Sequence, residues 1–329
     1  MNTIKIGIVG FGNLGKAVEK EIIKNKDMKL VGVFTRRNIS EIKTHSKDVK
    51  VIKFDEIFNY INYIDVMILC GGSATDLRYQ SPLLASSFNI IDSFDTHEKI
   101  NEHYKKVNAA SIEGGKTSII SVGWDPGLFS LIRLLSEAIL LNGNSYTFWG
   151  KGVSQGHSDA LRRVKGVEDA IQYTIPIEDA MNKVRKCENP ALETRDKHIR
   201  ECYVVAKEGY NLESIESEIK NMPYYFDEYD TTVNFISKEE LDKKKEKLPH
   251  GGFVFRSGLN GERNENSSII EFSLKLDSNP EFTAGILIAY ARANYRLNRE
   301  GVIGAKTILD IPLSYLLLNN SRLDINRYL

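Results

Sequence analysis

Cysteine is scarce in this sequence, and the few present have no metal-binding spacing. The 329 residues include three cysteines, Cys70, Cys187 and Cys202. An odd number without any CxxC pair argues against a disulfide framework and against a zinc site, and it suits a reducing compartment. We therefore expect buried thiols and no metal.

Net charge and long apolar runs are also absent. Lys plus Arg equals Asp plus Glu at 44 each, so no overall field attracts nucleic acid or an anionic membrane. No stretch approaches the roughly 18 uncharged apolar residues of a membrane span, and the amino terminus runs directly into a glycine-rich turn without targeting features. We expect a soluble, cytoplasmic protein that binds neither nucleic acid nor membrane.

Short apolar runs alternate with helical patterns through the first third of the chain. Strand-like runs occur at residues 4–10, 29–35, 50–54, 65–70, 89–95 and 117–123, with helical stretches near 14–25, 81–87 and 98–113. Strands joined through helices at this spacing form a parallel sheet, whose ligands bind at the carboxyl ends of the strands. The sequence thus predicts an α/β fold with a doubly wound parallel (Rossmann) sheet.

The pattern of predicted secondary structure changes near Ser145. Strands rich in Tyr, Phe and Val are expected at 145–150, 201–207, 232–237, 252–258 and 269–277, with few helices between them. This pattern favours a second, α+β domain over 124–280. A helical pattern from Phe282 and the segment after it are expected to pack on the first domain, so the dinucleotide-binding domain is predicted as 1–123 rejoined by about 281–329.

The first strand leads into a GxGxxG turn. Gly10, Gly12 and Gly15 follow a strand and precede a helix, the context in which glycines allow a tight turn and a pyrophosphate at the helix amides. The alternative is a glycine-rich turn without a ligand. The strand before it, the helix after it and the second strand about 20 residues on favour a dinucleotide site.

The second strand ends in Thr35, Arg36 and Arg37. NAD-specific sites place an acid there to bind the ribose 2′-hydroxyl. Two guanidinium groups and a hydroxyl suit a 2′-phosphate instead, which predicts NADP as the cofactor. A pair of surface arginines is the alternative. After the fourth strand, the small residues of "CGGSATD" (70–76) would let the backbone run close beneath the cofactor.

Carboxylates follow two later strands of the same predicted sheet. Asp92 and Asp95 follow the fifth strand, and Trp124 and Asp125 follow the sixth. Asp95 and Asp125 would lie at one crevice, where two acids can hold a cationic amino group and deprotonate it. The alternative is that both acids only cap helices.

The second domain contains a dense polar and aromatic stretch, "FWGKGVSQGHSDALRR" (148–163). Its aromatic residues and fixed polar groups are typical of a small-molecule pocket, although a core aromatic pair before a capped helix would look the same. Thr174, Arg200, His250 and Asn279 are further candidates for anion and amide contacts. Spacing alone does not select them.

Together these strings resemble meso-diaminopimelate dehydrogenase across essentially the whole chain: "VGFGNLG", "TRR", "GGSATD", "DSFDTH", "GWDPG", "TFWGKGVSQGHSDALRRVKGVEDAIQYT", "MPYYF", "LPHGG" and "KLDSNPEFTAG". The resemblance implies a homodimeric bacterial enzyme of lysine and peptidoglycan synthesis. It implies NADP-dependent, reversible oxidative deamination of the D-centre of meso-2,6-diaminopimelate to L-2-amino-6-oxopimelate, ammonia and NADPH.

The resemblance also implies roles for individual residues. Asp95 and Asp125 would hold the reacting amino group, with Trp124 and Trp149 shaping that end. Gln155 and Gly156 would contact the substrate; Thr174, Arg200 and His250 would bind its distal carboxylate, and Asn279 its distal amino group. The implied NADP contacts, with the glycines above, are Gly10, Phe11, Gly12, Asn13, Leu14, Gly15, Thr35, Arg36, Arg37, Cys70, Gly71, Gly72, Ser73, Asp92, Ser93, Phe94, Ser121, Val122, Gly123, Trp124 and Asp125.

Two other functions fit the same domain plan. One is another NADP-linked reductase, acting on a cyclic imine or a semialdehyde. The other is a non-catalytic NADP-binding regulator. The acid pair at the strand ends favours the dehydrogenase, since a reductase of an anionic cyclic substrate would favour a loop rich in Lys or His.

Overall fold

The protein, seen in a computed structural model, divides into two compact units. The structure describes residues 3–245 and 248–318. The first unit comprises residues 1–131 and 280–329, and the second comprises 132–279. The carboxyl-terminal segment 319–329, part of the expected return to the first domain, lies outside the described residues.

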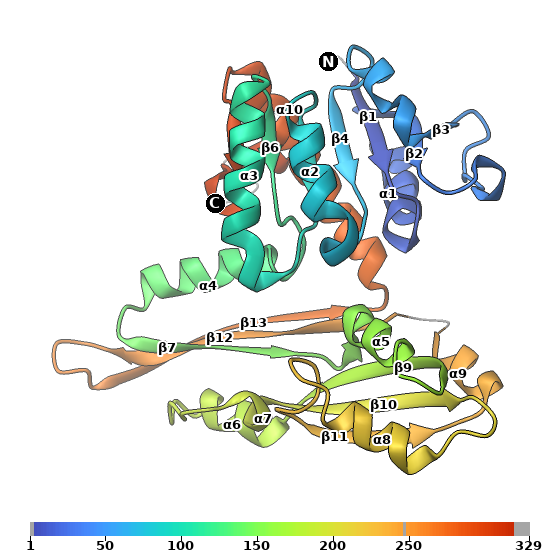
Figure 1. Cartoon of the computed structure of the whole chain (residues 1–329). Helices are drawn as coiled ribbons and strands as arrows, with labels where there is room; N and C mark the ends of the chain where they lie inside the picture. Colours follow the sequence, from blue (N-terminus) through green and yellow to red (C-terminus); the bar gives the residue numbers. More distant parts are fainter. Residues whose placement is uncertain (1–2, 246–247, 319–329) are drawn as a thin grey trace. The chain divides into compact units, whose positions relative to one another are not determined.

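A seven-stranded parallel sheet forms the centre of the first unit (Figure 1). Its strands are β1 (Ile4–Val9), β2 (Met28–Thr35), β3 (Lys50–Lys53), β4 (Val66–Leu69), β5 (Ile90–Asp92), β6 (Thr117–Ile119) and β14 (Gly304–Lys306). The order is β14-β6-β5-β4-β1-β2-β3. Strands β2 and β3 are added on one side of β1, and β4 and the later strands are added on its other side, so the order of addition reverses at β1. Ligands of doubly wound sheets bind outside the strand ends at such a reversal.

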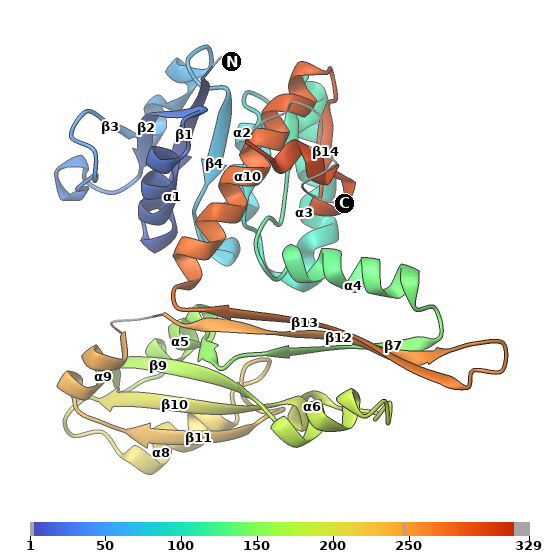
Figure 2. The same ribbon diagram turned by 180° about the vertical axis from the view of Figure 1, so that it is seen from behind.

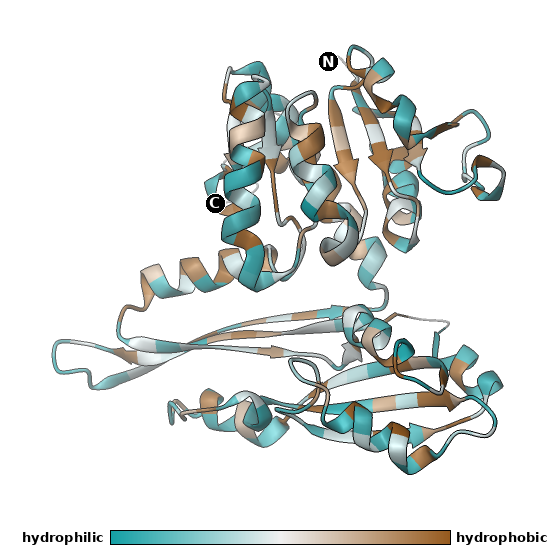
Figure 3. Ribbon diagram, in the orientation of Figure 1, coloured by the Kyte–Doolittle hydropathy of each residue, from teal (hydrophilic) through white to brown (hydrophobic). Residues whose placement is uncertain are grey.

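Helices cover both faces of this sheet, because successive side chains of each strand point to opposite sides. On one face, Ile6 and Ile8 pack with α1 (Asn13–Lys24) and α10 (Asn279–Arg299). On the other, Val9 and Met67 pack with α2 (Arg78–Ala85) and α3 (Ile100–Glu113). Figure 2 shows α1 and α10 together on the face opposite α2 and α3, and Figure 3 shows the strands as the apolar centre.

Two further sheets make up the second unit. A four-stranded sheet has the order β11-β10-β9-β8, and a three-stranded antiparallel sheet has the order β13-β12-β7. The strands are β7 (Gly143–Trp149), β8 (Gly152–Val153), β9 (Val167–Pro176), β10 (His198–Ala206), β11 (Asp230–Phe235), β12 (His250–Asn260) and β13 (Asn266–Leu276).

Short helices accompany the sheets of the second unit. They are α5 (Gln155–Arg162), α6 (Glu178–Arg185), α7 (Thr194–Lys197), α8 (Leu212–Lys220) and α9 (Lys238–Lys245), while α4 (Leu128–Ile139) begins in the first unit and ends in the second. Leu161, Ile215 and Ile219 of α5 and α8 pack on β9 and β10 in one apolar cluster. In α9 the side chain of Leu241 is buried in an apolar cluster with Val153, Ile171 and Val205, while all other residues of this helix are charged.

The predicted fold class is confirmed: a parallel doubly wound sheet with a second α+β unit. The helix expected from Phe282 is α10, and both α10 and β14 pack in the first unit. The sequence did not predict β8 or β9. The roles assigned to the two domains stay predictions.

Candidate active site

The glycine turn between β1 and α1 has the geometry that a pyrophosphate needs. Gly10 has a positive φ of 86°, which favours glycine, and a Cβ on Gly15 would lie 2.3 Å from the Gly10 carbonyl oxygen. A Cβ on Gly12 would meet nothing within 4 Å, so this position faces open space. The first turn of α1 has neither a side-chain cap nor an acidic residue. Its free N–H groups and positive dipole end are therefore available to a phosphate.

A pocket of about 560 Å³ opens beside this turn. It gathers nine of the residues predicted to bind the cofactor: Gly10, Phe11, Gly12, Thr35, Arg36, Arg37, Cys70, Gly71 and Gly72. The pocket therefore joins the ends of β1, β2 and β4, which are neighbours in the sheet. Its lining also includes Val9, Phe34, Phe54, Asp76 and Gln80, which the sequence did not indicate as cofactor contacts.

The two arginines of the pocket are held in different ways. Arg36 forms an ion pair with Asp76, whose Oδ2 also accepts a hydrogen bond from the Gly72 amide at 3.0 Å. Arg37 donates through its guanidinium to the backbone carbonyl of Phe11, and its amide donates to Thr35 Oγ1 at 3.1 Å. Both guanidinium groups are thus placed at the pocket, where they fit an anion.

The remaining predicted cofactor contacts do not line this pocket. Asn13, Leu14 and Gly15 belong to the first turn of α1, while Ser73, Ser93, Phe94 and residues 121–125 follow β4, β5 and β6. Their contact with a cofactor stays a prediction.

Asp92, another predicted cofactor contact, has a structural role inside the first unit. Its carboxylate is fully buried and accepts four hydrogen bonds: from Ser81 Oγ and His103 Nε2 at 2.7 Å each, and from the Ser121 and Phe94 amides at 2.9 and 3.1 Å. Both oxygens are used inside the protein. The Asp92 side chain therefore ties together the loops after β5 and β6, and a contact of this residue with a cofactor stays a prediction.

The two acids expected at the reacting centre follow neighbouring strands. Asp95 is exposed and lies in the loop after β5; its amide donates to Ser73 Oγ at 2.9 Å, which joins this loop to the one after β4. Asp125 is half-buried in the loop after β6, which pairs with β5. The adjacent Trp124 is 8% exposed and packs edge-on against Phe129, with ring centroids 5.2 Å apart.

In the second unit, two of the candidates, Thr174 and Arg200, are in contact. Thr174 and Arg200 are opposite each other in the antiparallel pair β9–β10, and the guanidinium donates to Thr174 Oγ1. Arg200 is 4% exposed and its guanidinium carbon lies 3.9 Å from the centre of the Tyr229 ring. Within the described part of the chain no carboxylate pairs with Arg200. A buried guanidinium without a counter-ion is expected to bind an anionic ligand.

The charge of Arg200 acts on the histidines around it. Burial, together with the positive charges of Arg200 and His250, lowers the pKa of His157 to about 3. The positively charged surroundings that disfavour a protonated imidazole favour a carboxylate. His250, half-buried at the start of β12, is thus placed in the same electrostatic environment as Thr174 and Arg200.

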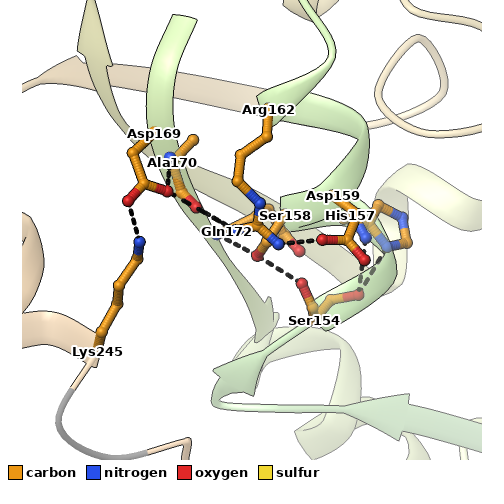
Figure 4. A network of polar contacts seen from close by, with 9 residues as sticks. All are labelled: Ser154, His157, Ser158, Asp159, Arg162, Asp169, Ala170, Gln172 and Lys245. Atoms are coloured by element: carbon orange, nitrogen blue, oxygen red, sulfur yellow. Dashed lines mark hydrogen bonds and ion pairs between the residues drawn. The ribbon is translucent and has the colours of Figure 1, made fainter. Parts of the chain in front are cut away.

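Helix α5 presents Gln155 and Gly156, both exposed, as its first two residues. Figure 4 shows how this helix is fixed to β9. Ser158 Oγ donates to the Ser154 carbonyl at 2.6 Å and accepts from the Gln172 amide at 3.0 Å. Arg162 donates to the Ala170 carbonyl at 2.8 Å. These bonds place the start of α5 beside β9, the strand that carries Thr174.

Trp149 is positioned by a histidine that sequence reasoning missed. The Trp149 amide donates to His198 Nε2 at 2.7 Å, and the two rings stack with centroids 5.2 Å apart. Burial lowers the pKa of His198 to about 3, and Arg200 and Lys197 contribute by their charge. His198 is therefore a neutral support for the indole.

Asn279 is the last residue of the second unit, and its backbone amide donates a hydrogen bond to the Leu248 carbonyl at 3.0 Å.

Within residues 3–245 and 248–318, no cluster of three or more His, Cys, Asp or Glu side chains is arranged to hold a metal ion. The same residues include no helix long and apolar enough to span a bilayer.

A parallel doubly wound sheet with a glycine turn and an arginine pair, joined to a second α+β unit with a buried arginine, defines the class of two-domain, Rossmann-type proteins. Residues 123–278 match the family model for the C-terminal domain of diaminopimelic acid dehydrogenase. The chain is 60% identical over 316 residues to the meso-diaminopimelate D-dehydrogenase of Acetivibrio thermocellus, covering 96% of this chain and 95% of the other. The chain belongs to the meso-diaminopimelate dehydrogenase family, as the sequence resemblance predicted.

Solved structures agree with this assignment. The Corynebacterium glutamicum diaminopimelate dehydrogenase in complex with its ligand, DAP, is 41% identical with a TM-score of 0.91, over 99% of this chain and 98% of the other. An engineered D-amino acid dehydrogenase bound to NADP+ is 39% identical with a TM-score of 0.86, over the same shares of the two chains.

Proposed function

We propose that this protein catalyses the NADP-dependent, reversible oxidative deamination of meso-2,6-diaminopimelate at its D-centre, giving L-2-amino-6-oxopimelate, ammonia and NADPH. One observation carries most of the proposal: near full-length identity of 60% to a dehydrogenase of this name. The pocket with two arginines and the buried anion site fit the two ligands that such a reaction needs.

The residues of the first unit fit NADP. The open space at Gly12 and the uncapped start of α1 suit the pyrophosphate, and Arg36 and Arg37 suit the 2′-phosphate. When bound, the nicotinamide supplies a hydride acceptor. The loops after β4, β5 and β6 would complete the binding of the nicotinamide end, through Ser73, Ser93 and residues 121–123.

We assign the reacting amino group to Asp95 and Asp125. Two carboxylates hold an ammonium group by charge-assisted hydrogen bonds, and the amine must lose a proton before its carbon can release a hydride. Either carboxylate can accept that proton. Trp124 and Trp149 would form the walls of this end and exclude water from it.

We assign the distal L-centre to the second unit. Its carboxylate would accept hydrogen bonds from Thr174 and Arg200 and lie near His250, while Asn279 would bind the distal amino group. Gln155 and Gly156, exposed at the start of α5, would contact the substrate chain. A substrate with two ammonium and two carboxylate groups has no net charge, which suits a neutral protein with locally placed acids and cations.

The experiment is the formation of NADPH from NADP+ and meso-diaminopimelate, followed by absorbance. A reductase of a cyclic imine or semialdehyde would consume NADPH with its own substrate and form none with meso-diaminopimelate. A non-catalytic regulator would bind NADP+ and form none with any substrate. Only the dehydrogenase produces NADPH here.

We also propose a cytoplasmic homodimer. In the second unit, the end of α4 exposes Leu134, Leu135, Ile139 and the following Leu141 to between 50% and 81%. An exposed apolar group of this kind marks an interaction surface. Replacing Leu135 and Ile139 by Glu should convert a dimer to a monomer in light scattering, with Leu83→Glu, exposed on α2, as the matched control. A wild-type monomer, or a dimer that survives the double change, would contradict this interface.

A further inference from the structure

Gln172, which no part of the proposed site includes, is buried beside Thr174. Both belong to β9, and residues two apart on a strand share a face. Gln172 is fully buried and Thr174 is 2% exposed. Gln172 Nε2 donates to Thr174 Oγ1 at 3.3 Å, and the Arg200 guanidinium donates to the same oxygen.

These two donors determine what the Thr174 hydroxyl can do. A threonine hydroxyl has two acceptor lone pairs and one proton. Gln172 and Arg200 occupy both acceptor positions, so the proton is left to donate to a third partner. That partner must be an acceptor, such as an anionic oxygen. Arg200 contributes a second donor, since its buried Nε has no hydrogen-bond partner among the residues that the structure describes.

Both backbone polar groups of Gln172 form hydrogen bonds. Its amide donates to Ser158 Oγ at 3.0 Å, and its carbonyl accepts from the Ser154 amide at 3.1 Å. Figure 4 shows Gln172 of β9 beside Ser154, which precedes α5, and Ser158 of α5. Because the backbone is fixed, the side-chain amide stays within reach of Thr174.

We propose that Gln172 is a positioning residue for the distal carboxylate: by donating to Thr174, together with Arg200, it turns the hydroxyl proton toward the substrate anion. This inference rests on the proposed function, which places that carboxylate at Thr174 and Arg200. Gln172 itself does not touch the substrate; it acts through Thr174.

The test compares two substitutions of nearly the same size. Gln172→Met removes the side-chain donor. Gln172→Glu replaces the donor by a carboxylate, which accepts a hydrogen bond from the Thr174 hydroxyl instead. Both substitutions should raise the KM for meso-diaminopimelate about tenfold and change kcat little. A tenfold change in affinity corresponds to the loss of about one hydrogen bond to a charged group. Dissociation constants for NADP+ and thermal midpoints, measured on the same samples, report whether each variant is folded.

A ligand without the distal carboxylate separates positioning from structural damage. D-Lysine is meso-diaminopimelate without that group. Its competitive inhibition constant against meso-diaminopimelate should stay the same in the wild type and in Gln172→Met. An equal weakening of D-lysine would mean that the substitution disturbs the whole site, and it would overturn the proposal.

The dependence on Thr174 is tested by a double-mutant cycle. Thr174→Val removes the hydroxyl, so adding Gln172→Met to it should cause no further rise in KM. Additive losses would overturn the proposal, and so would a Gln172→Glu variant with wild-type KM, since Gln172 would then be an acceptor. If the wild type forms no NADPH from meso-diaminopimelate, the proposed function fails instead.

Discussion

Replacing Arg36 by Gln should weaken NADP+ and leave NAD+ nearly unaffected. The Arg36 side chain is 62% exposed, so its contact with a 2′-phosphate is worth about 2 kcal/mol, near the low end for hydrogen bonds to charged groups. This corresponds to roughly a 30-fold rise in the NADP+ dissociation constant. NAD+ has no 2′-phosphate and loses no such contact. Calorimetric titration with both cofactors measures the two constants.

The partner of Arg36 supplies a matched control. Without the guanidinium, the Asp76 carboxylate stays unpaired in a pocket that must accept a phosphate, and like charges repel. Arg36→Gln/Asp76→Asn should therefore bind NADP+ several-fold more tightly than Arg36→Gln alone. Arg37 is a less specific probe, because it also holds the carbonyl of Phe11 in the glycine turn. An equal loss of NADP+ and NAD+ affinity in Arg36→Gln would refute the role of this residue in binding the 2′-phosphate.

Three further predictions concern the acids and one histidine. Asp125→Asn should lower kcat for meso-diaminopimelate by about 100-fold or more while the NADP+ dissociation constant stays within a few-fold; unchanged kcat would remove Asp125 from the chemistry. Asp92→Ala should cost about 3–5 kcal/mol in chemical denaturation, because it leaves His103 and two amides without their buried acceptor, whereas Ser81→Ala should cost only about 1. The folded pKa of His198 is about 3 against an ordinary value of 6.5, so the unfolded chain gains a proton first as pH falls. Its stability contribution is complete above pH 6.5 and decreases by about 2 kcal/mol at pH 5, a decrease that His198→Asn should remove from the pH profile of urea unfolding.

The parallel sheet and its glycine turn could be predicted because their causes are local. A strand such as Val66–Leu69 is buried on both faces and therefore reads as a continuous apolar run. The glycine turn needs its residue types at fixed spacing, and the arginines follow directly after a predicted strand. Local sequence patterns thus identified most of the residues that line the proposed cofactor pocket.

The anion site could not be found in this way, because its residues meet only through strand pairing. Thr174 and Arg200 are 26 residues apart and become neighbours through the antiparallel register of β9 and β10. Strand β9 itself was missed: Gln172 and Thr174 lie fully buried within it, and polar residues at buried positions obscure the apolar alternation that identifies strands. The resemblance to a family, not spacing, identified Thr174 and Arg200.

Asp76, Asp92 and His198 illustrate a different limit. Asp92 is the last residue of β5, His198 is the first residue of β10, and Asp76 lies in the segment that follows β4. Their roles follow from partners far away in sequence: Arg36 for Asp76, His103 for Asp92, and Trp149 for His198. Such pairings depend on the completed fold.

The most direct test of the account is a product analysis with the purified wild-type protein, NADP+ and single stereoisomers of diaminopimelate. A dehydrogenase specific for the D-centre gives equal amounts of NADPH and ammonia from the meso isomer, and no NADPH from the L,L isomer, which has no D-centre. No NADPH from the meso isomer, or equal rates with both isomers, would contradict the account.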